Sequence, residues 1–271
     1  MPELPEVETT RKGISTHLIG ATISDVVVRN HTLRYPITPQ LKSNLTGQAL
    51  TELSRRGKYL LFKFPNGTLI LHLGMSGVLR VLPQHTAIGK HDHMDLIFEN
   101  KKVLRFTDPR RFGCAVWTTE PPENHSLLAK LGHEPLSKHF NSDYLFEILK
   151  KRKTNIKSLI MDSKVVVGVG NIYASEALYD ARINPKVSSN RISRIRCELL
   201  VDSIKTILRQ AIKQGGTTIK DFTSAEGKPG YFAQNLKVYG RENKECFSCG
   251  NTIKHLVQAQ RSSYYCPTCQ R

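Results

Sequence analysis

The sequence lacks a long apolar run, since no stretch approaches the roughly 20 apolar residues that a membrane helix needs. It also lacks the start of a secretory signal, because Met1–Glu8 is acidic and broken by proline, with neither a basic head nor an apolar stretch. Internal repeats and low-complexity tracts are absent as well. We therefore expect no membrane anchor and a cytosolic or nucleoid location, where thiols stay reduced.

Acidic residues are scarce relative to basic ones. The 271 residues include 23 Asp and Glu against 40 Lys and Arg, which gives a formal net charge of +17. This excess favours a polyanionic partner, nucleic acid ahead of a membrane surface, although charge used for solubility or ribosome association fits it too. A length of 271 residues with 39% hydrophobic content suffices for two modest domains and argues against a disordered chain.

Disulfides are not expected in a reducing compartment, so the six cysteines need another explanation. Four of them form two Cys-x2-Cys pairs that sixteen residues separate, namely Cys246, Cys249, Cys266 and Cys269. This spacing predicts a four-thiolate zinc site. Such a closed site has no open coordination position, so we expect zinc to be structural. Cys114 and Cys197 lie among apolar residues and are expected to be small buried side chains.

The first half of the chain is strand-like behind a leading helix. Pro5 to Leu18 is predicted helical, with a proline in its first turn. Pro65-Asn66-Gly67 and Asn100-Lys101 are expected to form hairpin turns. The apolar segments that predict strands are Gly20–Arg29, Lys58–Phe64, Thr68–Leu73, Gly77–Leu82, Met94–Glu99 and Lys102–Thr107.

From about residue 135 the apolar period becomes helical. Helices are expected over Asp143–Lys151, Asn155–Asp162, Asn171–Ala181 and Ile192–Gln214. In the last of these, one face is predicted to pack into a core through Ile192, Ile195, Leu199, Ile204, Ile207, Leu208, Ala211 and Ile212. Gly215-Gly216 should stop this helix, and Thr217–Tyr239 is interpreted as a partly mobile loop.

Three features suit phosphate binding. In Val165–Asn171 an apolar stretch is followed by two glycines and an asparagine just before a predicted helix. This pattern favours an anion site, although an ordinary helix cap at Asn171 fits equally. The basic cluster Lys150–Lys153 is either a solvated face or a surface that tracks phosphates. Arg261 lies between the two cysteine pairs, where a rigid hairpin would hold its charge toward a phosphate.

Asp108–Gly113 places two arginines beside an aromatic ring after a strand. Arg110 and Phe112 could wedge into a base stack and replace an extruded base, whereas a surface turn with Phe112 packed inward is the plainer alternative. Met75 could fill the same gap, although a methionine between strands is more often core filler.

The amino terminus carries the chemistry that we expect. If the initiator methionine is removed, Pro2 becomes a terminal secondary amine whose pKa is expected near the α-amino range of about 7.7 to 8.0, so that a useful fraction is neutral near pH 7. Such an amine can attack a sugar carbon and form an iminium ion. Glu3 or Glu6 could protonate the opening sugar or the departing base. Alternatively, these carboxylates merely begin a helix.

Motifs along nearly the whole chain resemble bacterial formamidopyrimidine-DNA glycosylase. They are the start Met-Pro-Glu-Leu-Pro-Glu-Val-Glu-Thr, Gly57-Lys58, His72–Gly77, Lys90–His93, Asp108–Gly113, Gly168–Ser175, Gly227–Ala233 and the four-cysteine finger. The resemblance implies an α+β protein with an N-terminal β-sandwich domain and flanking helix over 1–134. It also implies a helix-two-turn-helix domain over 135–235 and a zinc finger hairpin over 236–271, with DNA crossing between the domains.

Site roles follow from the same resemblance. Pro2 becomes the Schiff-base nucleophile, Glu3 the acid for base loss and sugar opening, Lys58 a contributor to β-elimination and Arg261 to δ-elimination. Residues 217–239 look like a loop that closes over the flipped base. The implied DNA contacts and gap-filling residues are His91, Arg110, either Arg152 or Lys153, Lys157, Asn171, Met75 and Phe112.

The expected activity is excision of oxidised purines, such as 8-oxoguanine and formamidopyrimidines, followed by strand cleavage through β- and δ-elimination. The partner is duplex DNA that contains oxidised bases or abasic sites, one structural Zn²⁺ is the cofactor, and a bacterial monomer is expected. The presence of all three gap-filling residues favours this branch over the related endonuclease VIII branch, which prefers oxidised pyrimidines. The more distant alternative is a non-catalytic DNA-binding protein with a structural zinc site. This alternative does not explain the unusual Pro2-Glu3 sequence at the amino terminus.

Overall fold

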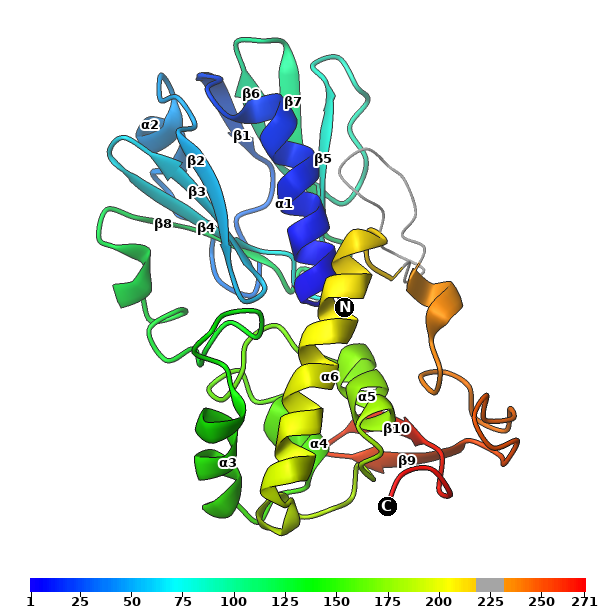
Figure 1. Ribbon diagram of the computed structural model, residues 1–271. Helices are drawn as coiled ribbons and strands as arrows, with labels where there is room; N and C mark the ends of the chain where they lie inside the picture. Colours follow the sequence, from blue (N-terminus) through cyan, green and yellow to red (C-terminus); the bar gives the residue numbers. More distant parts are fainter. Residues whose placement is uncertain (218–231) are drawn as a thin grey trace. The chain divides into compact units, whose positions relative to one another are not determined.

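The computed structural model describes residues 1–217 and 232–271 (Figure 1). These residues form two compact units. The first comprises 1–130 with the described part of 214–233, and the second comprises 131–213 and 234–271. Most of the predicted loop over 217–239, together with residues 227–231 of the motif over 227–233, lies outside the described residues.

The first unit contains two four-stranded antiparallel sheets. One has the strand order β1-β6-β7-β5 and the other the order β2-β3-β4-β8. The strands of the first sheet are β1 (Ile23–Val28), β6 (Asp92–Phe98), β7 (Lys102–Thr107) and β5 (Val78–Pro83). Those of the second are β2 (Glu52–Arg56), β3 (Tyr59–Phe64), β4 (Gly67–His72) and β8 (Cys114–Thr118). Apolar residues of both sheets share one buried cluster, so the two sheets form the expected β-sandwich.

Helix α1 (Leu4–Leu18) lies along this sandwich (Figure 1). It contacts β2 and β3 of one sheet and β5 of the other, and β2 and β5 are edge strands. Val7, Ile14 and Leu18 enter the common core at the spacing of one helical face. The helix therefore covers an open side of the sandwich and brings its amino terminus against the sheets. A short helix α2 (Leu41–Leu45) and a 3-10 turn η1 (Pro122–Asn124) complete the unit.

All six predicted strands are present, and Pro65-Asn66 forms the tight turn between β3 and β4. Strands β2 and β8 were not predicted. The sequence of β2 lacks the apolar pattern of a strand, because three of its five residues are the charged Glu52, Arg55 and Arg56. The pairing of β2 with β3, rather than its own composition, makes it a strand.

The second unit is helical and ends in a β-hairpin. Its helices are α3 (Ser142–Lys150), α4 (Ile156–Ile160), α5 (Asn171–Asp180) and α6 (Arg194–Lys213), with a 3-10 turn η2 (Ser189–Arg191). The 3-10 turn η3 (Phe232–Asn235) precedes the finger, whose strands are β9 (Lys254–Gln258) and β10 (Arg261–Tyr265). Helix α5 is buried from Ile172 to Tyr179 and packs on α4, α6 and β10. It is the central support of this unit.

The apolar face predicted for α6 is partly wrong. Ile204, Ile207, Leu208 and Ala211 are buried as expected, but Ile195 is 71% and Leu199 52% exposed. Cys197, Leu200 and Val201 face the core instead, because the buried stripe at this end of the helix runs one to two residues further on. Cys114 and Cys197 are both buried, as predicted. None of the helices in the described ranges is long and apolar enough to cross a membrane.

Candidate functional site

Pro2 and Glu3 are buried at the amino-terminal end of α1. Glu3 and Glu6 form a capping box, in which the Glu3 backbone N–H donates to Glu6 Oε2 at 2.8 Å. The other oxygen of Glu6 accepts the backbone N–H of Thr217 at 2.8 Å. Glu6 thus uses both carboxylate oxygens to hold backbone, and the Glu3 side chain in turn accepts the Glu6 backbone N–H, so both acids are fixed at the start of α1.

Lys58 lies in a two-residue turn between β2 and β3, where Gly57 has a φ of +57°. Arg55 connects this turn to α1, because its guanidinium donates to the Gly57 carbonyl at 2.8 Å and to Glu8 at 3.0 Å. Burial alone would raise the pKa of Glu8, but hydrogen bonds from Arg11 and Arg55 lower it below its usual value. The ionised Glu8 therefore fixes the turn of Lys58 against the helix that begins just after Pro2.

Two loops of the sandwich meet around the buried carboxylate of Asp108. One oxygen accepts the Ser76 hydroxyl at 2.8 Å and the other accepts the Gly113 N–H at 2.8 Å. Gly74 approaches so closely that a Cβ at this position would lie 2.4 Å from the carbonyl carbon of Phe112. Its φ of +66° also favours glycine. Asp108 thereby joins the loop of Met75 to the loop that carries Arg110 and Phe112.

The predicted gap-filling residues therefore lie on adjoining loops. Phe112 is 42% exposed and Arg110 is exposed, with its guanidinium 5.0 Å from the centre of the Phe112 ring. Met75 is half-buried. Together with Thr32–Arg34 and Arg111, Arg110 and Phe112 line an open pocket of about 480 Å³. This geometry disagrees with the alternative of an inward-packed Phe112.

His91 is half-buried, and its carbonyl accepts the Asp108 N–H at 3.0 Å, so it adjoins the same loop. A second histidine, His72, was not predicted as a site residue. Its Nδ1 accepts the Gly74 N–H at 2.9 Å, which leaves the proton on Nε2. Burial, assisted by the nearby cations Lys58 and Arg34, lowers the pKa of His72 to about 4. His72 is thus a neutral donor close to Lys58, a property that only the folded environment reveals.

In the second unit, Asn171 is the first residue of α5 rather than its cap, which is Gly170. The side-chain Oδ1 of Asn171 is buried and has no hydrogen-bond partner within the described residues. Because amide oxygen and nitrogen are interchangeable by a flip, this position can present either a donor or an acceptor. An unsatisfied polar group beside the positive end of a helix favours an anion site over the ordinary cap.

The basic residues before α4 differ in exposure. Arg152 and Lys153 are exposed. Lys157, for which a DNA contact was expected, is 1% exposed, and its Nζ donates to the Ser262 carbonyl at 2.7 Å and the Ser263 hydroxyl at 2.8 Å. Its charge is directed at β10, so Lys157 supports the hairpin instead of presenting a cation at the surface.

Arg261 begins β10 directly after the turn of that hairpin and is exposed. The two turn residues Ala259 and Gln260 have φ values of +47° and +60°, which matches a type I′ turn formed without glycine. Arg261 lines a pocket of about 210 Å³ together with Lys157, Ser158, Met161, Gln258 and Ala259. The hairpin therefore presents this exposed cation directly after its turn.

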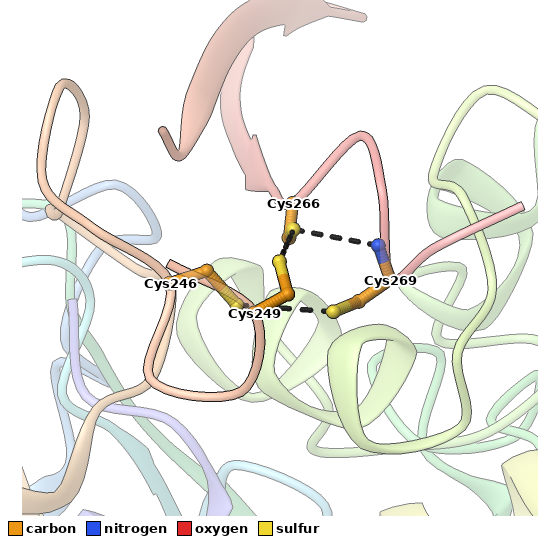
Figure 2. Close-up of side chains that lie close together, drawn as sticks. All are labelled: Cys246, Cys249, Cys266 and Cys269. Atoms are coloured by element: carbon orange, nitrogen blue, oxygen red, sulfur yellow. Dashed lines mark hydrogen bonds between the residues drawn. The ribbon is translucent and has the colours of Figure 1, made fainter. Parts of the chain in front are cut away.

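The four predicted cysteine ligands converge (Figure 2). Their sulfurs lie within 4.8 Å of one another, with 3.9 Å between Cys246 and Cys269 and 3.5 Å between Cys249 and Cys266. A tetrahedral site with Zn–S bonds of about 2.3 Å has sulfur–sulfur edges of about 3.8 Å, so the set fits zinc. These cysteines hold one structural zinc ion.

Comparisons with known proteins agree with this geometry. Family models match residues 1–115 (formamidopyrimidine-DNA glycosylase N-terminal domain), 131–223 (formamidopyrimidine-DNA glycosylase H2TH domain) and 243–271 (zinc finger found in FPG and IleRS). Formamidopyrimidine-DNA glycosylases of Shewanella amazonensis and Escherichia coli O6:H1 are 53% and 54% identical, over 100% of this chain and 99% and 100% of theirs.

Solved structures give the same result. Lactococcus lactis Fpg in complex with abasic-site DNA has a TM-score of 0.93 at 35% identity and covers 99% of each chain. MutM (Fpg) of Thermus thermophilus has a TM-score of 0.90 at 36% identity, over 99% of this chain and 98% of that one. The chain therefore belongs to the formamidopyrimidine-DNA glycosylase family, and it is a DNA glycosylase of base excision repair with abasic-site lyase activity.

Proposed function

We propose that this enzyme excises oxidised purines from duplex DNA through an iminium (Schiff-base) intermediate formed by Pro2, and then cuts the strand by β- and δ-elimination. The observation that carries this proposal is the buried Pro2-Glu3 start of α1, with the Lys58 turn tied to the same helix through Arg55 and Glu8. The solved complexes of Lactococcus lactis Fpg with abasic-site DNA and with N7-benzyl-Fapy-dG DNA support the substrate class.

The nucleophile requires that Met1 be removed, because the Pro2 nitrogen is otherwise an amide without a basic lone pair. The free secondary amine attacks C1′ of the damaged nucleotide, and the bond from C1′ to the base breaks with a proton delivered to the base. Loss of the ring-oxygen bond then gives a C1′ iminium ion. Because the iminium withdraws electrons, the C2′–H becomes acidic and its removal expels the 3′ phosphate.

Glu3 is assigned the proton transfers of base loss and sugar opening. Glu6 holds backbone through both of its oxygens, and Glu3, whose side chain accepts the Glu6 N–H next to Pro2, is the acid proposed to act on the substrate. Lys58 assists the first elimination as a nearby cation. Arg261 assists the second elimination, in which the C4′–H is lost and the 5′ phosphate departs, and this leaves a one-nucleotide gap flanked by phosphates.

Met75, Arg110 and Phe112 are proposed to fill the space that an extruded base leaves. The support is their position on two loops that Asp108 joins, with Phe112 and Arg110 exposed. Insertion of an apolar side chain costs a few kcal/mol of base unstacking, which is least at a damaged pair and so contributes to selectivity. Asn171, His91 and either Arg152 or Lys153 are proposed phosphate contacts. Binding of undamaged DNA through these phosphate contacts would place the enzyme on the nucleoid.

The first test is borohydride trapping of the purified protein on a duplex with 8-oxoguanine opposite cytosine. Reduction converts the iminium into a stable amine, so the expected result is a covalent adduct that maps to Pro2. Pro2→Gly retains a terminal amine, a primary one, whereas a form that keeps Met1 has no amine on Pro2. If the form with Met1 traps and cleaves as well as the processed form, Pro2 is not the nucleophile.

A panel of lesions tests the substrate class. Duplexes with 8-oxoguanine, a formamidopyrimidine or an oxidised pyrimidine are compared by single-turnover excision rates. We expect both purine lesions to be excised faster than the pyrimidine. The reverse order would assign the enzyme to the preference of the endonuclease VIII branch.

A further inference from the structure

The zinc finger is hydrogen-bonded to a side chain of helix α5. The hydroxyl oxygen of Tyr179 lies 3.2 Å from Cys246 Sγ and 2.8 Å from Ser248 Oγ. The Tyr179 side chain is 2% exposed and shares a packed cluster with Val238, Cys246, Ile253 and Cys266. The contact is therefore buried, and it joins two segments that are 67 residues apart in the chain.

Zinc binding fixes the direction of these hydrogen bonds. A coordinating cysteine is a thiolate and carries no proton, so Tyr179 must be the donor to Cys246 Sγ. With its proton so used, the phenol oxygen accepts the Ser248 hydroxyl. The guanidinium of Arg182 lies 5.4 Å from the centre of the Tyr179 ring and adds positive charge to this side of the site. Its Nη2 donates to Ser248 Oγ at 3.5 Å, so Arg182 supports the serine that donates to the phenol oxygen.

Four thiolates around Zn²⁺ carry a net charge of −2, which is costly to bury without donors. Within the finger, the Cys269 N–H donates to Cys266 Sγ at 3.4 Å and Asn251 Nδ2 to Cys249 Sγ at 3.7 Å. The Tyr179 bond to Cys246 is shorter than either. It comes from the helix that supports the unit, and it ends on a cysteine that is 3% exposed.

We infer that Tyr179 is a positioning residue of the zinc centre, which donates to the Cys246 thiolate, retards loss of the metal and fixes the first cysteine pair to the carboxyl end of α5. Helix α5 begins at Asn171, and it also packs on β10, the strand of Arg261. The hydroxyl therefore connects the metal to the helix that aligns two proposed phosphate contacts. If Tyr179 served only to fill space, its ring alone would suffice.

The test compares the full-length zinc-loaded Tyr179→Phe variant with a matched Tyr264→Phe variant. Tyr264 packs on the same cluster and stands edge-on to Tyr239, with 5.1 Å between ring centres. Transfer of zinc to a chromogenic chelator is followed in both. We expect release from Tyr179→Phe to be about tenfold faster than from the parent, as for loss of other hydrogen bonds to metal ligands. Equal release from the parent and Tyr179→Phe, or equal acceleration in both variants, overturns the inference.

Cobalt substitution gives a second measurement, the energy of the sulfur-to-Co²⁺ charge-transfer band. Looser packing alone does not change this energy. Sulfur-to-Co²⁺ charge transfer shifts to lower energy when a thiolate loses a hydrogen bond, because its electrons are held less tightly. We expect this shift in Co²⁺-loaded Tyr179→Phe and not in Tyr264→Phe. A smaller shift in the same direction is expected in Ser248→Ala, which removes the donor to the phenol oxygen. An unchanged band in Tyr179→Phe would show that the hydroxyl does not donate to Cys246.

Discussion

His72 illustrates how a single residue makes stability depend on pH. Burial first, and then the cations Lys58 and Arg34, lower the pKa of His72 to about 4 in the folded protein, whereas the unfolded chain protonates near 6.5. Between pH 6.5 and about 4, the unfolded state therefore binds a proton on His72 and the folded state does not. Stability is lost as pH falls from 6.5 toward 4, by up to ~3 kcal/mol at the lower limit.

This loss is measured by urea unfolding of the first unit's tryptophan signal at pH 7.5 and at pH 5. His72→Gln keeps a side-chain acceptor for the Gly74 N–H but does not titrate in this range. We expect the variant to lose less stability than the parent between the two pH values. If the losses are equal, His72 does not carry this pH dependence.

Asp108 is the residue on which the geometry of the gap-filling loops depends. In Asp108→Ala the buried Gly113 N–H and Ser76 hydroxyl lose their acceptor, at a cost of about 1–3 kcal/mol for each group left unsatisfied. Because the loops are proposed to serve base extrusion, excision of 8-oxoguanine should fall at least tenfold, whereas cleavage at a ready-made abasic site should fall much less. Single-turnover rates on the two substrates measure this difference.

Ser76→Ala is the intermediate variant, since it removes the Ser76 hydrogen bond to Asp108 and the acceptor of the Arg110 N–H at 3.2 Å but leaves the hydrogen bond from Gly113 to Asp108. Its effect on excision should be smaller and in the same direction. Equal falls on both substrates in Asp108→Ala would mean that the loops act on the reaction itself or on general stability, and not on extrusion.

Residue identities were predicted better than residue contacts. The sequence indicated Met75, Arg110 and Phe112 through their types, but the acceptor that joins their loops, Asp108, has no local pattern. Its partners Ser76 and Gly113 are 32 and 5 positions away, and the first of them becomes a neighbour only when the sandwich folds. Lys157 shows the same limit, because the resemblance implied a DNA contact but did not indicate that its Nζ donates to Ser262 and Ser263 of β10.

At the scale of elements, strands bounded by clear turns were predicted and those defined by pairing were not. Strand β3 has an apolar pattern and ends at Pro65-Asn66, whereas β2 becomes a strand through its pairing with β3. The face of α6 was predicted from periodicity, which does not fix the exact angle of the buried stripe at each end of the helix. At its amino-terminal end the stripe runs through Cys197, Leu200 and Val201, and Ile195 and Leu199 are exposed.

Helix α5 also holds the segment that enters the finger. Glu176 is 3% exposed, and its carboxylate accepts three backbone N–H groups, those of Lys237, Val238 and Tyr239, at 2.8–2.9 Å. Glu176→Gln replaces one acceptor by an NH2 group that faces a donor. We expect these three amides to lose roughly 2 kcal/mol of protection against hydrogen exchange, about a thirtyfold faster exchange.

Asp180→Asn is the control on the same helix. Asp180 pairs with Lys237 at 3.6 Å, and both side chains are substantially exposed, so removing this pair should change protection by less than about 0.5 kcal/mol. Similar exchange in the two variants would contradict a role of the buried carboxylate in holding residues 237–239.

At the scale of the whole molecule, the net charge of +17 predicted a polyanionic partner but not which cations meet it. Many of them are already used inside the fold. Arg105 is 2% exposed and binds Asp95 at 2.9 Å, and Arg55 binds Glu8. These neutral pairs cancel in the net charge, but a count of Lys and Arg treats their cations like the exposed Arg152 and Lys153, and so it overstates the number available to a partner.

The salt dependence of DNA binding separates the two kinds of cation. Each phosphate that a side chain neutralises contributes about −0.9 to the slope of log K against log salt concentration. Arg152→Ala or Lys153→Ala, whichever residue contacts a phosphate, should reduce the slope on undamaged duplex by about one unit. Lys42→Ala is the control, because Lys42 is exposed but paired with Asp25 at 2.8 Å, and it should leave the slope unchanged. If Arg152→Ala and Lys153→Ala both behave like Lys42→Ala, the cluster before α4 is a solvated face, and the charge that binds DNA lies elsewhere.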